Sequence, residues 1–118
     1  MARPKPFPYD TLLRVRQLEE RQKAQRLAEV RNKIFRASRE REFLDQEQFQ
    51  MLFEAASRAS GRFDARDVRL YYIYERLLAR RAAEKDAEIV SLGRLEKERR
   101  RELEHAMKRR RIVERLEA

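Results

Sequence analysis

The stretch from Leu70 to Leu78, which reads LYYIYERLL, decides the fold of this chain. It opens a segment that runs to Val113 without a proline and with one glycine, Gly93. Apolar residues in this segment recur at alternating steps of three and four, which places them on one face of a helix. Because 43% of the 118 residues are charged, the pattern predicts long helices that bury a narrow seam against each other.

The predicted helix around this stretch covers residues 65–117, and its seam mixes apolar with charged positions. Since Glu96 and Arg99 interrupt the apolar spacing, we expect looser pairing there than elsewhere. The seam positions are Tyr71, Glu75, Leu78, Ala82, Lys85, Ile89, Leu92, Glu96, Arg99, Leu103, Ala106, Arg110 and Val113.

A second helix is predicted upstream, over residues 10–58, where the chain has neither glycine nor proline. Its seam is more apolar and consists of Leu27, Val30, Ile34, Ala37, Arg41, Leu44, Gln48, Met51 and Ala55. Further upstream, Leu12, Val15 and Leu18 continue an apolar face slightly out of register with Leu27. This offset predicts a stutter, or a helix that wraps gradually around its partner.

Proline and glycine divide the chain at two places. All three prolines lie within the first eight residues, which predicts an extended arm over residues 1–9 followed by Asp10 as the helix N-cap. Residues 59–64 contain Gly61, which suits the end of a helix, and Asp64, which suits the N-cap of the next. The sequence therefore predicts one all-α domain, a long antiparallel two-helix coiled-coil hairpin.

The composition argues against an enzyme. The chain has no cysteine and a single histidine, His105, which lies between Glu104 and Ala106 on a charged helix. Such a histidine is expected to be a solvated surface residue, and no glycine-rich phosphate loop is present. We therefore expect no catalytic activity, no metal and no cofactor. No segment approaches the roughly 18 uncharged apolar residues of a membrane span, and the N-terminus lacks a signal peptide pattern.

The net charge of +9 suggests an acidic partner, such as a nucleic acid. However, 21 acidic residues are interleaved with the 30 basic ones along nearly the whole chain. The clearest local excess lies between Arg94 and Arg111, with nine basic and four acidic residues. This segment is either a docking surface for an acidic partner or an ordinary solvated helix face.

Seven of the ten aromatic residues lie close to the predicted turn: Phe43, Phe49, Phe53, Phe63, Tyr71, Tyr72 and Tyr74. Two helices cannot bury all of them, because three closely spaced tyrosines on one helix point in three directions. They either cover the end of the hairpin or form an exposed patch that contacts another protein. We favour the contact patch.

Three motifs resemble the FliJ family of flagellar type III export proteins, and they occur in the family's order over nearly the whole chain. They are Phe7 to Arg16 (FPYDTLLRVR), Leu70 to Leu78 (LYYIYERLL) and Ala106 to Leu116 (AMKRRRIVERL). The resemblance implies a coiled coil in the cytoplasm, peripheral to the inner face of the cell membrane at the flagellar base. It implies a non-enzymatic stalk and adaptor that binds the hexameric export ATPase, the export-gate membrane protein and empty export chaperones.

The resemblance, together with the aromatic cluster and the basic segments, predicts two sets of partner-binding residues. Contact with the export gate falls late in the first helix and early in the second, on Phe49, Phe53, Tyr71, Tyr74 and Leu78. Contact with the ATPase ring falls near the two chain ends, on Arg14, Arg100, Arg101, Arg109 and Arg110. Two alternatives remain open: the equivalent stalk of a virulence type III secretion system, and a basic helical hairpin that binds nucleic acid or the ribosome.

Overall fold

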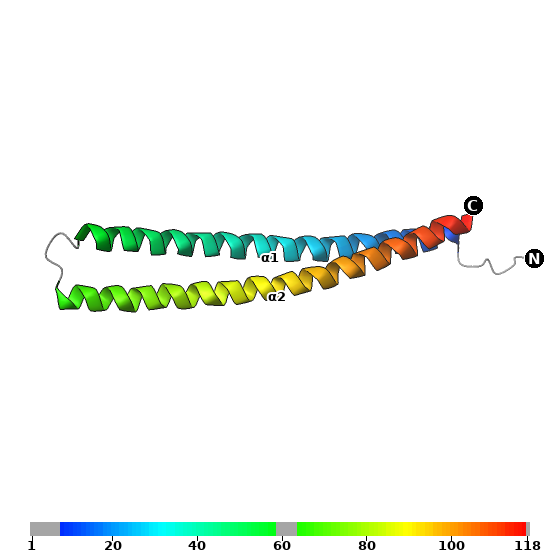
Figure 1. Cartoon of the computed structure of the whole chain (residues 1–118). Coiled ribbons are helices and arrows are strands. Elements are labelled where there is room, and N and C mark those ends of the chain that lie inside the picture. Colours follow the sequence, from blue (N-terminus) through cyan, green and yellow to red (C-terminus); the bar gives the residue numbers. More distant parts are fainter. Residues whose placement is uncertain (1–7, 59–63, 118) are drawn as a thin grey trace, which may run out of the picture. The chain divides into compact units, whose positions relative to one another are not determined.

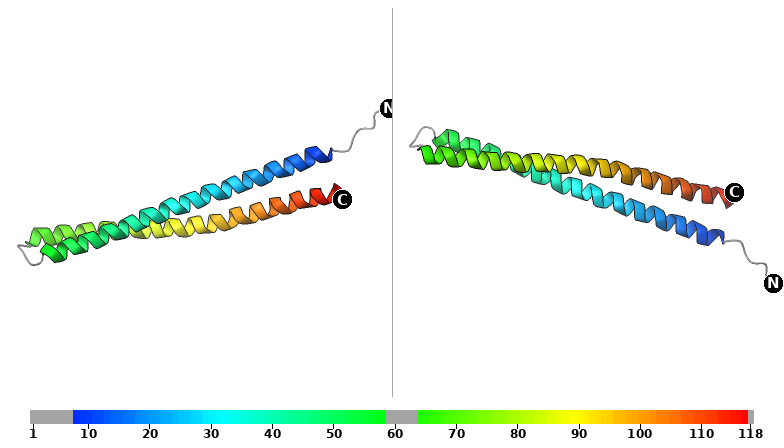
Figure 2. Two further views of the ribbon diagram at one scale, coloured as in Figure 1. Left: turned by 90° about the horizontal axis from the view of Figure 1, so that it is seen from above. Right: turned by 90° about the horizontal axis from the view of Figure 1, so that it is seen from below.

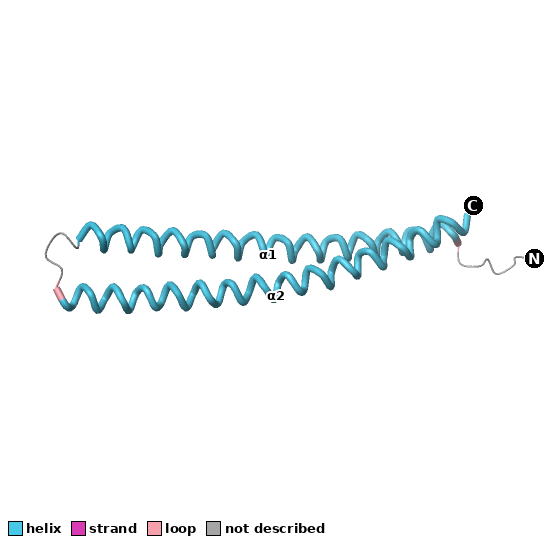
Figure 3. The backbone as a smooth tube through the Cα atoms, viewed as in Figure 1, coloured by secondary structure: helices cyan, strands magenta, loops and turns pink. Residues whose placement is uncertain are grey.

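The computed structural model describes residues 8–58 and 64–117 and contains two helices, α1 (Tyr9–Arg58) and α2 (Ala65–Glu117) (Figure 1). Every described residue except Pro8 and Asp64 is helical (Figure 3). The predicted helix bounds are confirmed to within one residue. Most of the predicted arm, and Gly61 in the predicted turn, lie outside the described residues.

The N-terminus of α2 is capped as predicted. The Asp64 Oδ1 atom accepts a hydrogen bond of 2.9 Å from the backbone N–H of Asp67, the usual geometry of an aspartate N-cap. The backbone N–H of Val68 donates to the Asp64 carbonyl at 3.2 Å, which closes the first turn.

The prediction for the N-terminus of α1 is wrong by two residues. The backbone N–H of Leu12 donates to the carbonyl of Pro8 at 3.0 Å, so Pro8 holds the cap position. Asp10 lies inside the first turn of α1. There its carboxylate faces the positive end of the helix dipole, which is favourable without a capping bond.

The chain divides into two compact units, each of which takes a segment from both helices. Unit 1 comprises Met1–Asn32 and Gly93–Ala118, and unit 2 comprises Lys33–Leu92. Both helices continue through the division (Figure 2). Gly93 is an ordinary helical residue of α2.

In unit 2, α1 and α2 run antiparallel around a small core. Leu44, Leu78 and Ala82 form a buried cluster, and Met51 packs against it. Glu40, which precedes Leu44 in α1, pairs with Lys85, which follows Ala82 in α2. Rising residue numbers in α1 therefore meet falling numbers in α2, as the predicted hairpin requires.

Unit 1 shows the same antiparallel order. Glu19 of α1 pairs with Arg109 of α2 at 3.7 Å, and Lys23 pairs with Glu102 at 3.8 Å. Among the described residues of this unit, the buried side chains are Leu27, Val30, Ala106 and Val113.

Every predicted seam position is buried or half-buried, which confirms the three-four spacing along both helices. The predicted offset upstream of Leu27 is wrong. Leu12 is half-buried, but Val15 and Leu18 are 40% and 55% exposed. The seam instead continues in unbroken three-four steps through the half-buried Lys23, Glu20, Arg16 and Leu13. Charged residues pair in this part of the seam, so hydrophobicity alone does not reveal it.

Candidate partner-binding surfaces

The two units differ sharply in surface chemistry. Unit 1 contains 18 basic and 10 acidic residues, whereas unit 2 contains 12 and 11, so unit 1 carries almost all of the net charge of +9. Large apolar side chains show the opposite division. Of the sixteen recorded as exposed among the described residues, twelve belong to unit 2. One unit therefore presents a basic surface and the other an apolar one.

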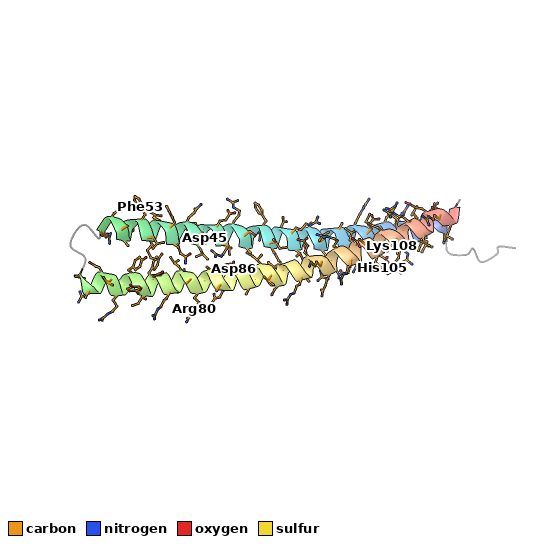
Figure 4. All side chains as sticks on the ribbon, in the orientation of Figure 1. Asp45, Phe53, Arg80, Asp86, His105 and Lys108 are labelled. Atoms are coloured by element: carbon orange, nitrogen blue, oxygen red, sulfur yellow. The ribbon has the colours of Figure 1, made fainter. Side chains whose placement is uncertain are left out.

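The apolar surface of unit 2 includes three of the predicted gate residues. Phe49, Phe53 and Tyr74 are 71%, 66% and 45% exposed. Figure 4 shows Phe53 on the side of α1 that faces away from α2. Phe49 and Phe53 are four residues apart on α1, and we call these two side chains the aromatic patch, whereas Tyr74 lines a groove between α1 and α2. Exposed aromatic side chains of this kind contribute contact area at low entropic cost, which is typical of protein-binding surfaces.

Tyr71, another predicted gate residue, belongs to the seam and only partly to the surface. It is half-buried and lines a groove between α1 and α2 together with Met51 and Tyr74. Its ring meets the Tyr72 ring edge to face, with centroids 5.8 Å apart. Desolvation, followed by the neighbouring Glu75 carboxylate, raises the pKa of the Tyr71 hydroxyl.

The assignment of Leu78 to the gate contact is corrected. Its side chain is 0% exposed and lies at the centre of the unit 2 core, so it has no surface to offer a partner. The sequence analysis missed four further exposed apolar residues of unit 2: Leu52, Leu70, Ile73 and Leu77. Their positions off the three-four seam were the available signal, because an apolar residue off the seam must face solvent or a partner.

The five predicted ring residues divide into three groups. Arg14 and Arg101 are exposed, and no ion pair is recorded for either within residues 8–58 and 64–117. Arg100 pairs with Glu96 at 2.6 Å, and Arg109 pairs with Glu19 of α1. Arg100 and Arg109 therefore form ion pairs within the chain itself.

Arg110 is a structural residue of the seam. Its guanidinium pairs with Glu20 across the helix interface and with Glu114 one turn farther along α2, the latter at 2.7 Å. The hydrogen bonds that Arg110 donates to Glu114 and then to Glu20 raise the pKa of Arg110. Because both partners hold the half-buried side chain in place, Arg110 serves helix pairing more than the outer surface.

The basic segment identified in the sequence places an exposed stripe on the outer face of α2 in unit 1, a spacing that the sequence analysis did not identify. Its residues are exposed and follow three-four spacing offset from the seam, with only Glu104 interrupting them. They are Arg94, Lys97, Arg101, Lys108, Arg111 and Arg115. Among the described residues no ion pair is recorded for any of these six. Reading the seam and then its opposite face would have revealed the stripe.

Unit 2 also places two cations in its seam, and both are paired across the interface. Arg41 Nε donates to Asp86 Oδ1 at 2.8 Å, and Figure 4 shows Asp86 between the two helices. Lys85 pairs with Glu40 of α1 and with Glu88 at 3.0 Å. Hydrogen bonds to these carboxylates raise the pKa of both cations, Asp86 first for Arg41 and Glu40 first for Lys85.

His105 is exposed on α2, beside Glu102 and Arg109 in a shallow groove of unit 1. In the part of the chain that the structure describes, no group of acidic or histidine side chains has the arrangement of a metal site. Over the same residues, neither helix contains an apolar stretch long enough to cross a membrane.

The surfaces themselves are thus the basis for a functional argument: a basic stripe in unit 1 and an aromatic patch in unit 2. Both are exposed, so each can contact another molecule: the stripe through charge and the patch through apolar area. Comparison of the chain with family models, curated proteins and solved structures found no match.

Proposed function

We propose that this protein is a non-enzymatic stalk and adaptor of the flagellar type III export apparatus. In this proposal the basic surface of unit 1 binds the hexameric export ATPase, and the aromatic patch of unit 2 binds the export-gate membrane protein. Empty export chaperones are further partners. The protein then works in the cytoplasm, at the inner face of the membrane, held there by the gate protein.

The observation that carries the proposal is the separation of two surfaces on one helical pair. Eighteen basic residues against ten acidic ones suit unit 1 to an acidic partner. The nearly neutral unit 2, with Phe49 and Phe53 exposed, suits an apolar contact. A protein that connects two different partners needs two such surfaces, and the sequence resemblance places the gate contact late in the first helix and early in the second, within unit 2.

The ATPase contact is tested by reversing the basic stripe. A variant with Arg101, Lys108 and Arg111 changed to Glu is compared with the parent for stimulation of the purified export ATPase of the same organism. All three side chains are exposed, so helix content should not change. We expect stimulation to be lost, because the stripe then repels an acidic surface that it normally attracts.

The matched control changes three exposed arginines of unit 2, Arg66, Arg69 and Arg80, to Glu. It alters the net charge by the same amount and leaves the stripe intact, so stimulation should persist. Equal loss in both variants would attribute the effect to total charge. Full stimulation by the stripe variant would contradict the proposed ring contact.

The gate contact is tested by changing Phe49 and Phe53 to Ala and measuring binding to the soluble part of the export-gate protein. Two exposed aromatic anchors are expected to contribute at least about tenfold in affinity. Phe35→Ala is the control, since Phe35 is 61% exposed but lies outside the patch. Unchanged affinity in the double variant would place the gate contact elsewhere, and circular dichroism verifies that the helices persist.

Nucleic-acid binding is the second candidate, favoured by the six unpaired cations of the stripe. Such binding would weaken linearly on a logarithmic salt scale, with a slope set by the number of phosphates contacted. Titration of the parent and the stripe variant with duplex DNA and with RNA distinguishes the two candidates. A steep salt dependence lost in the stripe variant, together with no ATPase stimulation by the parent, would favour this candidate. Stimulation of a virulence secretion ATPase alone would favour the related secretion stalk.

A further inference from the structure

A groove in unit 2 lies outside both surfaces of the proposed function. Its walls are formed by Arg39, Phe43 and Glu47 of α1 and by Arg81, Glu84 and Glu88 of α2. Phe43 is 59% exposed, whereas the neighbouring Leu44 belongs to the core. The groove therefore exposes an aromatic ring between charged side chains.

Four of these charges have no recorded counterpart. Within residues 8–58 and 64–117, no ion pair is recorded for Arg39, Glu47, Arg81 or Glu84, although Lys85 beside them pairs with two carboxylates. The Arg39 guanidinium lies over the Phe35 ring, 5.7 Å from its centroid. An arginine stacked in this way keeps its N–H groups free for a carboxylate in the plane of the guanidinium.

The charges on α1 are arranged symmetrically about Phe43. Arg39 precedes Phe43 by four residues and Glu47 follows it by four. On a helix each lies about 6 Å along the axis from Phe43, and all three side chains follow one stripe. When α1 is rotated by 180° about an axis that passes through Phe43 and is perpendicular to the helix, Arg39 takes the position of Glu47 and Glu47 takes the position of Arg39. The rotation therefore exchanges a positive charge with a negative one.

We propose that this groove binds a second copy of the chain, in a two-fold symmetric contact between antiparallel α1 helices. Phe43 packs against Phe43 of the second copy at the axis. Arg39 pairs with Glu47 of the second copy, and Glu47 pairs with its Arg39, as a two-fold contact requires.

The charge distribution limits where two copies can meet. Unit 1, with 18 basic and 10 acidic residues, repels a second unit 1, whereas unit 2, with 12 and 11, is nearly neutral. The contact is small, since each copy contributes mainly Phe35 and Phe43, which are 61% and 59% exposed. We therefore expect a reversible dimer with a dissociation constant of about micromolar order.

The test uses charge reversal in the full chain and sedimentation over a range of protein concentrations. Arg39→Glu alone, or Glu47→Arg alone, places like charges opposite each other twice and should weaken the dimer at least about tenfold. The double variant restores both pairs and should recover parental affinity. An equimolar mixture of the two single variants should also recover it, because each variant complements the other. Arg80→Glu, an exposed reversal outside the groove, is the control.

Recovery in the double variant and in the mixture supports the antiparallel contact, since Arg39 and Glu47 are eight residues apart and do not pair within one helix. A parent chain that remains monomeric up to about 1 mM would overturn the proposal. So would a dimer that the single reversals leave unchanged, or one that neither combination restores. Circular dichroism of each variant verifies that the charge reversals have not unfolded the helices.

Discussion

Leu78→Ala tests whether the core of unit 2 is assembled as described. Leu78 is the only large side chain recorded as fully buried among the described residues. It forms the buried cluster of unit 2 together with Leu44 and Ala82. The substitution removes three buried carbon atoms, worth about 2.4 kcal/mol at ~0.8 kcal/mol each. The cavity left behind adds a further term, although two helices relax toward each other more easily than a closed core. We expect a total loss of about 3 kcal/mol.

The neighbouring Leu77 provides a matched control. It has the same side chain on the same helix, but it is 41% exposed and lies off the seam. Leu77→Ala should therefore cost less than about 1 kcal/mol, partly offset by the better helix propensity of alanine. Urea unfolding followed by far-UV circular dichroism gives both free energies of unfolding. Equal losses for the two variants, or a loss below about 1 kcal/mol for Leu78→Ala, would refute the described pairing.

Three further predictions concern the helices themselves. Gly93→Ala should raise the free energy of unfolding by about 1 kcal/mol, because no atom beyond the adjacent residues and the surrounding helix backbone lies within 4 Å of the added Cβ, and alanine favours the helix. A lower melting temperature would contradict this. Asp64→Ala should cost about 1 kcal/mol by removing the acceptor for the Asp67 N–H, whereas Asp64→Ser should restore most of it in the same urea assay. Stability should fall above pH ~10, since the raised pKa values of Lys85 and Tyr71 mean that the folded state holds their protons more tightly than the unfolded chain. Lys85→Arg should reduce this loss in alkaline titrations.

Much of this architecture follows from spacing alone. Residues that follow one another at steps of three and four share one face of a helix. The charged residues Arg41 and Lys85 continue the spacing of the apolar residues, so they were assigned correctly to the seam. The prediction failed where apolar character was used in place of spacing. Val15 and Leu18 are apolar but exposed, and Lys23 is charged but half-buried.

The candidate surfaces were harder to predict, because the sequence does not state which of several neighbouring residues is already paired. Arg110 and Arg111 are adjacent in the sequence, yet one is held in the seam by Glu20 and the other is exposed. Similarly, Leu77 and Leu78 differ by one position and by almost the whole of their burial. Whether a residue can bind a partner depends on the face of its own helix on which it lies and on whether it already pairs with the other helix. The sequence of one helix predicts the face but not the pairing.

The paired charges inside unit 2 restrict how its helices can move. Sliding α2 by one heptad would keep apolar residues on the inner face, but it would bring Ala79 or Gly93 opposite Arg41 in place of Asp86. A half-buried guanidinium would then lose its cross-helix carboxylate, which is costly. Lys85 adds a second such penalty. The two cross-helix pairs therefore favour one longitudinal alignment, and a piston-like shift of one helix past the other would have to break both of them.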